Sequence, residues 1–391
     1  MSDLKNVNQD SILIFEYFTS SGVTDLSIVS EAEEIIRSLA IELRDKDIYV
    51  LVSKEFEDLF DDLDFDVKTI VIGESLEGWL ENNAEIFSKA MFVASEANMD
   101  IYNFTKILES KNVSVYGSDS YSVKLCSDKY EIFDYLGRRV RQPMTFNILL
   151  NSKTYWKRAI QIFFDTINGD YGDSQSDSVP IMQKPRDIPV LDNSDREIEK
   201  EHKLIAKPRF GVDCENIKLI SSKLDIDELE NIYDDGSRFV IQEFIEGDVC
   251  SVSLISDGKT AVPISLNKQV IEITDEGGKY VGGCTPYENP FKNQAFELAK
   301  KACEFIPGLK GFIGVDLIIT EEGEVYLIEI NSRFTTSYVG LQKIADFNIA
   351  SSIIDLLDGN MDVEELERNI SYNSKVHFLK DENGILDINI E

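Results

Sequence analysis

The sequence predicts an α/β unit with a parallel sheet, followed by α+β units. Between residues 11 and 118, short apolar runs alternate with segments of helical periodicity, and this order is typical of a parallel sheet covered by helices. Near the C-terminus, two apolar runs flank a short polar turn, which indicates an antiparallel hairpin. The chain of 391 residues is long enough for two or three such domains.

The first unit is expected to alternate five strands with helices. One of these helices carries a start signal, because Ser30 precedes the periodic segment 30–43 as an N-cap and Glu33 follows three residues later as in a capping box. The expected strands cover 11–18, 48–53, 67–73, 90–96 and 114–118.

The rest of the chain mixes helices and strands. Residues 119–164 look mostly helical, with a break at 138–150. The segment 165–180 is rich in Asp, Ser and Gly, so it can bury little surface and is expected to be a long loop. The remaining expected elements are a charged helix at 195–202, strands at 249–256, 312–320 and 325–333, helices at about 291–305 and 341–357, and a Gly-rich segment at 275–290. The stretches 204–211 and 238–247 lie between them.

Composition narrows the classes of partner. The net charge of −33 argues against nucleic acid or an anionic membrane as a partner. The five cysteines form no CxxC pair and only two histidines are present, so neither a disulfide framework nor a zinc site is expected. The polar N-terminus shows no signal peptide, and no apolar run approaches the roughly 20 residues that span a bilayer. A reduced, cytoplasmic setting is therefore expected.

The late hairpin places two acids opposite each other. A two-residue or a four-residue loop gives the same register, which pairs Asp316 with Glu329. Facing residues lie about 5 Å apart, and like charges there repel, so a cation should sit between them. Period-two alternation adds Asn331 and Arg333 to this face. Carboxylate and amide oxygens suit Mg²⁺ or Mn²⁺; the alternative is an ordinary solvated face.

The other face of the same strand is expected to point into a core. By the same alternation, the side chains assigned to that core are Tyr326, Ile328 and Ile330.

Two nucleotide motifs are absent. The stretch SDGKT (256–260) ends like a P-loop, but position 253 is Ser where the first Gly would stand, so the stretch is interpreted as a hairpin turn. No GxGxxG follows the first strand, which excludes a dinucleotide fingerprint there.

Five stretches of the chain form an ordered set of motifs: SDKYEIFDYL (127–136), LIAKPRFGVDC (204–214), VIQEFIEGDVCSVS (240–253), FIGVDLI (312–318) and YLIEINSR (326–333). In this order they resemble the ATP-grasp superfamily, over about residues 11–360. The resemblance implies two α+β subdomains that clamp ATP, after an N-terminal pre-ATP-grasp domain at 11–118. It divides the rest into a central subdomain at 119–245, with an acidic insertion at 165–200, and a C-terminal subdomain at 246–391 that holds the metal.

The resemblance also implies roles for single residues. Lys129 and Lys207 match the two phosphate-binding lysines, and Lys124 is a rival for Lys129. Cations there would neutralise charge on the phosphoryl group being transferred. Arg333 matches the arginine that steadies the transferred phosphate, and its fork suits that task. Together, Lys207 and Arg333 are the expected catalytic residues. The single Gly211 in the phosphate-covering loop departs from the family pattern, in which several glycines are common.

The remaining roles concern the nucleotide and the metal. The resemblance implies that the hinge residues Gln242, Glu243, Phe244 and Ile245 hold adenine, while the ribose hydroxyls would meet Glu246 or Asp248. The metal ligands would be Asp316, Glu329 and Asn331.

Within the superfamily, residues 12–22, 95–98 and 265–269 are similar to archaeal tyramine–glutamate ligases of methanofuran biosynthesis. This implies an amide formed through an acyl-phosphate from the γ-carboxylate of L-glutamate and the amine of tyramine. Two alternatives stay open: another ATP-grasp amino-acid ligase, and a nucleotide-binding regulatory protein without turnover. The expected partners are small molecules, and a homodimer stays open. Candidate substrate contacts are Ser20, Ser21, Gly22, residues 267–269, the Gly-rich 277–283 segment, Tyr280 and Tyr338. The alternative for the Gly-rich segment is a flexible lid.

Overall fold

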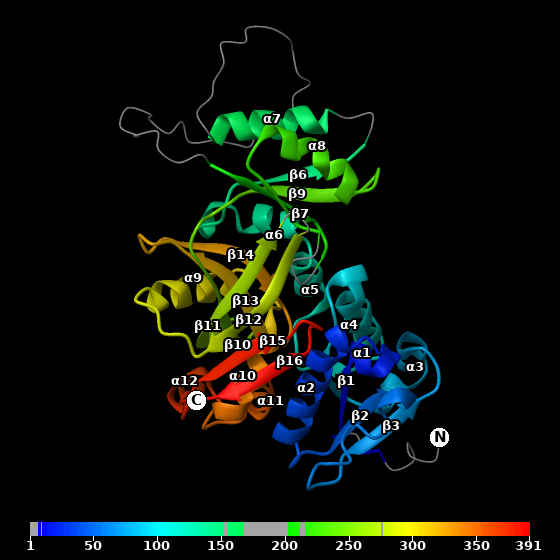
Figure 1. The fold of residues 1–391 in the computed structure, drawn as a ribbon. Coiled ribbons are helices and arrows are strands. Elements are labelled where there is room, and N and C mark those ends of the chain that lie inside the picture. The colour runs from blue at the N-terminus through cyan, green and yellow to red at the C-terminus, as the bar shows by residue number, and fades with distance from the viewer. Residues whose placement is uncertain (1–6, 9, 152–154, 168–201, 212–215, 275–276) are drawn as a thin grey trace.

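The described part of the chain forms three sheets in the computed structural model (Figure 1). The structure describes residues 7–8, 10–151, 155–167, 202–211, 216–274 and 277–391. The expected loop at 165–180 and charged helix at 195–202 therefore lie almost wholly outside the described residues. Each sheet falls within one of the three predicted units, while the boundaries between the units stay a prediction.

The first sheet is parallel throughout, as expected, in the order β3-β2-β1-β4-β5. The expected capping box was wrong: α2 begins one turn earlier, where Asp25 accepts a hydrogen bond from the Ser27 amide, so Ser30 lies inside the helix. The elements of this unit are β1 (Ile12–Glu16), α1 (Tyr17–Ser21), α2 (Leu26–Glu42), β2 (Ile48–Ser53), β3 (Lys68–Ile72), α3 (Leu76–Asn83), β4 (Lys89–Val93), α4 (Asp100–Ser110) and β5 (Ser114–Val115).

The second sheet is antiparallel, in the order β6-β9-β7-β8, and has a hydrophobic core of its own with α7 and α8. Two helices, α5 and α6, lead into it from the first unit. The elements are α5 (Ser120–Cys126), α6 (Lys129–Leu136), β6 (Thr145–Leu149), α7 (Trp156–Ile167), β7 (Leu204–Pro208), β8 (Lys218–Ile220), α8 (Lys223–Ile232) and β9 (Arg238–Glu243).

The third sheet has the order β14-β13-β10-β11-β12-β15-β16. Its Gly-rich segment is strand β12, paired with β11 and β15, so the alternative of a flexible lid was wrong. The helix expected at 341–357 is two helices. The elements are β10 (Asp248–Asp257), β11 (Ala261–Thr274), β12 (Gly277–Thr285), α9 (Lys292–Glu304), β13 (Lys310–Ile319), β14 (Val325–Asn331), α10 (Thr336–Ile344), α11 (Ile349–Leu357), α12 (Val363–Asn369), β15 (Val376–Lys380) and β16 (Leu386–Ile390).

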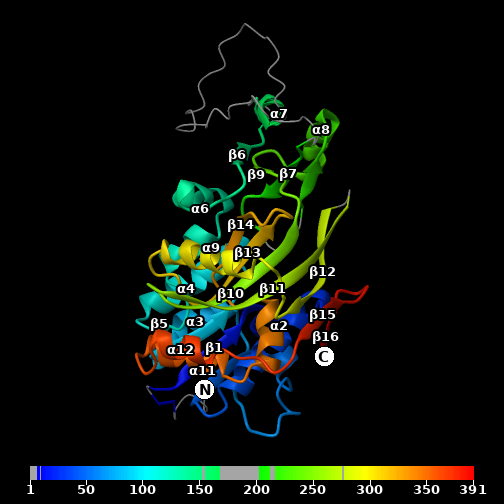
Figure 2. The ribbon, with the colours of Figure 1, turned by 90° about the vertical axis from the view of Figure 1, so that its left-hand side faces the viewer.

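The seven-stranded sheet lies between the other two units. Both views show the four-stranded sheet with α7 and α8 at one end of the molecule and the first unit at the other (Figures 1 and 2). Residues of β1, β2 and α2 share one core with α10 and α11, so the first and third units are packed as one body. The SDGKT stretch is the turn between β10 and β11, as predicted, with Gly258 at φ +92°.

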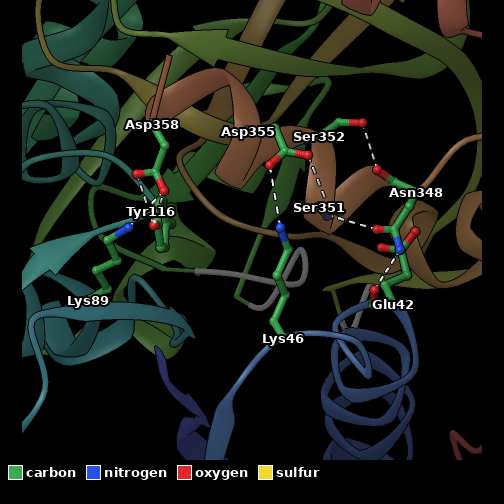
Figure 3. Close-up of polar contacts among 9 residues, drawn as sticks. All are labelled: Glu42, Lys46, Lys89, Tyr116, Asn348, Ser351, Ser352, Asp355 and Asp358. Carbon is green, nitrogen blue, oxygen red and sulfur yellow. Dashed lines mark hydrogen bonds and ion pairs between the residues drawn. The ribbon is translucent and has the colours of Figure 1, made fainter. Parts of the chain in front are cut away.

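Polar contacts reinforce the interface between the first and third units (Figure 3). At one end, Lys89 pairs with Asp358 at 2.7 Å, and the Tyr116 hydroxyl donates to the same carboxylate at 2.9 Å. At the other end, the buried Glu42 carboxylate accepts from the first amides of α11, at 2.7 Å from Ile349 N and 2.9 Å from Ala350 N. A carboxylate at a helix N-terminus is favourable because it meets unpaired amides and the positive end of the helix dipole.

In the part of the chain that the structure describes, no helix is both long and apolar enough to cross a membrane.

Titration of Glu42 is expected to make the stability of the protein depend on pH. Burial raises its pKa from 4.5 to about 7, against the hydrogen bonds that it accepts. The native state therefore binds this proton more tightly than the unfolded chain, so the stability from Glu42 is present below pH 4.5 and is lost as pH rises to about 7. We expect the stability deficit of Glu42→Gln relative to wild type to narrow by up to about 3 kcal/mol between about pH 5 and about pH 8.

Urea unfolding of both proteins across that range measures the difference. Glu34→Gln is the control, because it removes another α2 carboxylate, one that pairs with Lys343 at 3.3 Å. A deficit for Glu42→Gln that is constant with pH would contradict the prediction.

Candidate active site

A cavity of about 560 Å³ lies between the second and third sheets. Strands β7 and β9 and the segment after β9 line one side, while β10, β11, β13 and β14 line the other. Ten of its described lining residues are charged: Lys129, Lys207, Lys268, Arg333, Lys380, Glu31, Glu243, Glu246, Asp316 and Glu329. The cavity is thus balanced in charge, although the whole chain carries −33.

The acid pair predicted from the hairpin is present. Asp316 on β13 is paired with Glu329 on β14, and both line the cavity. The register then shifts by one residue, since Leu317 pairs with Leu327 and leaves Ile328 as a bulge. A bulge reverses the alternation beyond it.

The expected core assignment of the neighbouring side chains was therefore wrong in part. Ile330 is buried, as predicted, but Ile328 faces the cavity and Tyr326 is only partly buried. The core positions nearest the turn are Val325 and Leu327. The bulge moves these two side chains to the core face in place of the two that strict alternation selects.

Hydrogen-bond donors surround the acid pair. Lys129 Nζ lies 2.8 Å from Glu329 Oε1 and also donates to the Gly211 carbonyl at 2.8 Å. The amides of Gln269 and Asn331 each donate to Asp316 at 3.0 Å. Burial, followed by the charge of Glu329, raises the pKa of Asp316 to about 6, so the site favours a nearby positive charge.

The donor chemistry fits a hard divalent cation. Asp316, Glu329 and the Asn331 amide supply oxygen ligands, which Mg²⁺ and Mn²⁺ prefer. Within the described ranges, no group of three or more His, Cys, Asp and Glu side chains is arranged to hold a metal ion. Mg²⁺ usually takes only one or two carboxylates and completes its shell with water or substrate phosphates, so a two-carboxylate site agrees with a metal that arrives with a nucleotide.

Apart from Asp248, the predicted nucleotide residues line the same cavity. Lys207 on β7 donates to the Gln242 side chain on β9 at 3.0 Å, and Gln242 in turn donates to Thr145 on β6 at 3.0 Å. This chain of hydrogen bonds fixes the Lys207 side chain across three strands. The hinge residues that follow along the lining are Glu243, Phe244, Ile245 and Glu246.

Two of the predicted candidates, Asp248 for the ribose and Lys124 for phosphate, are absent from the described lining of this cavity. Asp248 is absent from the described lining, and its carboxylate accepts from Tyr287 at 2.8 Å, accepts from Asn289 at 3.2 Å and pairs with Lys268. Of the two acids considered for the ribose, only Glu246 lines the cavity. Lys124 lines a different hollow, against α5 and α6, which leaves Lys129 as the lysine beside the acid pair.

Arg333 joins the site to the first unit. Its Nε donates to Glu96 Oε2 at 2.8 Å, and this pair is well buried, with exposed side-chain fractions of 17% and 4%. Glu96 follows β4 at the carboxyl end of the parallel sheet, an edge where ligands commonly bind in open α/β sheets. The Glu96 contact was not predicted, because it joins residues that are remote in sequence.

A second unpredicted pair holds Lys129 in place. Arg209, just after β7, donates to both oxygens of Asp128, at 2.8 and 2.7 Å, and both side chains are buried. The Asp128 carboxylate also caps α6 through the amides of Tyr130 and Glu131. The main chain closes the same link, since the Lys129 amide donates to the Arg209 carbonyl at 3.2 Å. Charge-assisted bidentate pairs of this kind are strong and directional.

The predicted substrate contacts divide into two groups. Residues 267–269 and Tyr280 line the cavity. The other candidates do not: the Ser20 hydroxyl donates to the Leu51 carbonyl, Ser21 and Gly22 are absent from the described lining, and the buried Tyr338 hydroxyl donates to Glu42. Tyr338 is fully buried, so it belongs to the core rather than to a binding surface.

Sequence comparisons find a matching domain model and a similar protein. Residues 181–337 match the ATP-grasp domain. A tyramine–L-glutamate ligase of Methanocaldococcus fervens is 29% identical over 360 residues, which cover 91% of this chain and 95% of that protein.

Solved structures agree in fold. An ATP-grasp superfamily protein from Archaeoglobus fulgidus aligns with a TM-score of 0.62 at 22% identity, over 97% of this chain and 98% of that one. The biotin carboxylase domain of Hydrogenobacter thermophilus 2-oxoglutarate carboxylase, solved with MgADP and bicarbonate, aligns with a TM-score of 0.63 at 13% identity, over 95% and 74%.

The buried pair beside Lys129 predicts a large stability effect. We expect Arg209→Met to lower the free energy of unfolding by about 3–5 kcal/mol, because it leaves the Asp128 carboxylate buried without its partner. Arg141→Met is the matched control, since Arg141 pairs with Glu324 at 2.6 Å but both side chains are about half exposed; its expected loss is below about 1 kcal/mol. Chemical unfolding measures both, and equal losses would refute the role of the buried pair.

Proposed function

We propose that this chain, which belongs to the ATP-grasp superfamily of ligases, joins the γ-carboxylate of L-glutamate to the amine of tyramine. The observation that carries the proposal is the 29% identity to a tyramine–L-glutamate ligase, because it extends over nearly the whole of both chains. The charged cavity supports the same reaction class, since it brings Lys129, Lys207 and Arg333 together with the acid pair.

The residues of the chain supply positioning and charge neutralisation. Lys129 and Lys207 would hold the phosphates of ATP from opposite walls, and Arg333 would stabilise the group being transferred. Asp316, Glu329 and Asn331 would hold Mg²⁺ or Mn²⁺, which when bound neutralises charge on the phosphates. The carboxylate substrate would accept the γ-phosphate, and the amine would then displace phosphate from the acyl-phosphate to form the amide. These two reaction steps require no nucleophilic side chain from the protein.

Phosphate release tests the proposed substrates. We expect release from ATP and Mg²⁺ only when L-glutamate and tyramine are both present, with γ-glutamyltyramine as the product by mass spectrometry. Release that requires glutamate but accepts other amines equally would contradict tyramine as the substrate and favour another amino-acid ligase. A failure of every acid and amine pair would favour a nucleotide-binding protein without turnover.

Replacement of one acid tests the metal assignment. We expect Glu329→Gln to raise the Mg²⁺ concentration for half-maximal turnover by about tenfold or more, because a neutral amide binds a hard cation less well than a carboxylate. Glu324→Gln is the matched control on the same hairpin, since Glu324 pairs with Arg141 near the exposed turn. Unchanged metal dependence in Glu329→Gln would show that Glu329 is not a ligand.

A further inference from the structure

One part of the cavity is lined by residues outside the ATP-grasp motifs. Glu31 comes from α2, Tyr280 from β12, and Phe378 and Lys380 from β15. Strand β15 lies beyond about residue 360, where the sequence resemblance ends. It reaches the cavity because it pairs with β12, with Gly283 opposite Phe378.

The Gly-rich strand is shaped to place Tyr280 there. The pairing of β11 with β12 shifts between Gly282 and Tyr280, so Val281 forms a bulge. A Cβ on Gly283 would lie 2.1 Å from the Lys268 carbonyl and 3.3 Å from the Tyr280 hydroxyl. Glycine at this position therefore allows β11 and β12 to pair closely while the phenol lies beside the strand.

Glu31 and Lys380 form an ion pair at the cavity wall. Lys380 Nζ lies 3.3 Å from Glu31 Oε2, and their side chains are 14% and 21% exposed. The same ammonium lies 5.6 Å from the centre of the Tyr280 ring, and the Thr336 hydroxyl donates to Glu31 Oε1. This single contact is looser than the bidentate pair of Arg209, so exchanging it for a ligand costs less.

Tyr280 connects this wall to the acid pair. Its pKa is raised by burial, and further by the negative charges of Glu31 and Asp316. The backbone places the ring near the acid pair, because the Tyr280 hydroxyl lies beside Gly283 and Gly283 pairs with Gln269. The Gln269 amide in turn donates to Asp316 at 3.0 Å. A molecule bound at Glu31 and Lys380 would lie alongside the residues expected to handle phosphate.

We propose that Glu31, Lys380 and Tyr280 form the subsite that recognises the zwitterionic head group of an α-amino acid. Lys380 binds the α-carboxylate and Glu31 binds the α-ammonium, so each charge of the free pair is matched by one charge of the ligand. The side-chain carboxylate of the amino acid then extends towards Arg333 and Asp316. This inference rests on the proposed function and assigns its acid substrate to a place in the cavity.

Tyramine fits this subsite less well. Its single ammonium would satisfy Glu31 but would separate Lys380 from its partner and offer the lysine no anion. A charged group left without a partner in a partly buried site is unfavourable.

Selectivity between truncated substrates tests the subsite. 4-Aminobutyrate keeps the reacting carboxylate and the amine of L-glutamate but lacks the α-carboxylate, while glutarate lacks the ammonium. We expect Lys380→Met to reduce the preference for L-glutamate over 4-aminobutyrate, measured as the ratio of kcat/KM values, by about tenfold or more. Glu31→Gln should reduce the preference over glutarate to a similar extent. KM for ATP should stay unchanged in both.

Two control variants separate recognition from structural damage. Lys279→Met changes the exposed lysine next to Tyr280, and Glu34→Gln removes an ion pair between α2 and α10 outside the described cavity lining. Both should keep the wild-type ratios. If wild type turns over and the Lys380 and Glu31 variants also keep those ratios, the subsite is wrong while the proposed function stands.

A binding measurement covers the case in which wild type shows no turnover. L-Glutamate is titrated calorimetrically into the protein with Mg²⁺ and a non-hydrolysable ATP analogue. Binding by wild type that weakens at least about tenfold in Lys380→Met supports the subsite even though the proposed function has failed. No binding to wild type, or equal binding to both proteins, overturns the subsite.

Discussion

The arrangement of the cavity depends on compensating the repulsion between two carboxylates. Asp316 and Glu329 face each other across a hairpin, where like charges are unfavourable unless cations or donors compensate them. Asn331 of the same hairpin supplies one donor, while Lys129 from α6 and Gln269 from β11 come from distant parts of the chain. The compensation of the acid pair therefore depends on α6 and β11 being packed beside the hairpin. A metal ion carried by phosphates would meet the same electrostatic demand.

Two separately packed parts of the protein line the cavity. The first and third units share a continuous core, reinforced by Glu42 at the start of α11. The second sheet has a separate core, and it carries Lys207. The Arg209–Asp128 pair and the Lys129 contacts therefore join two separately packed parts beside the cavity. Their geometry is maintained by buried, bidentate hydrogen bonds, which are more directional than apolar contacts.

Local patterns predicted the parallel first sheet and the pairing of Asp316 with Glu329, because alternation and turn length act over a few residues. Local patterns failed where one extra residue in a strand shifts its pairing register. The bulge at Ile328 reverses the expected faces of the β14 residues that precede Glu329, and no feature of VYLIEINSR marks it. Composition also misled, since Gly-rich β12 is a strand whose glycines permit close pairing. The contacts of Glu96 and Lys380 could not be predicted from the sequence, because they depend on which distant strands become neighbours.

The charge inside the cavity differs from the charge of the whole chain, so the acidity of the protein does not exclude a small anionic ligand. The net charge of −33 acts at long range and disfavours extended polyanions. Fields from exposed charges fade over about 8–10 Å at physiological salt, so a small anion inside the cavity meets mainly the lining. There the described carboxylates are matched one for one by lysines and an arginine. A nucleotide bound there with a divalent cation would add positive charge beside Asp316 and Glu329. Its phosphates would then meet the lysines and the arginine of the lining.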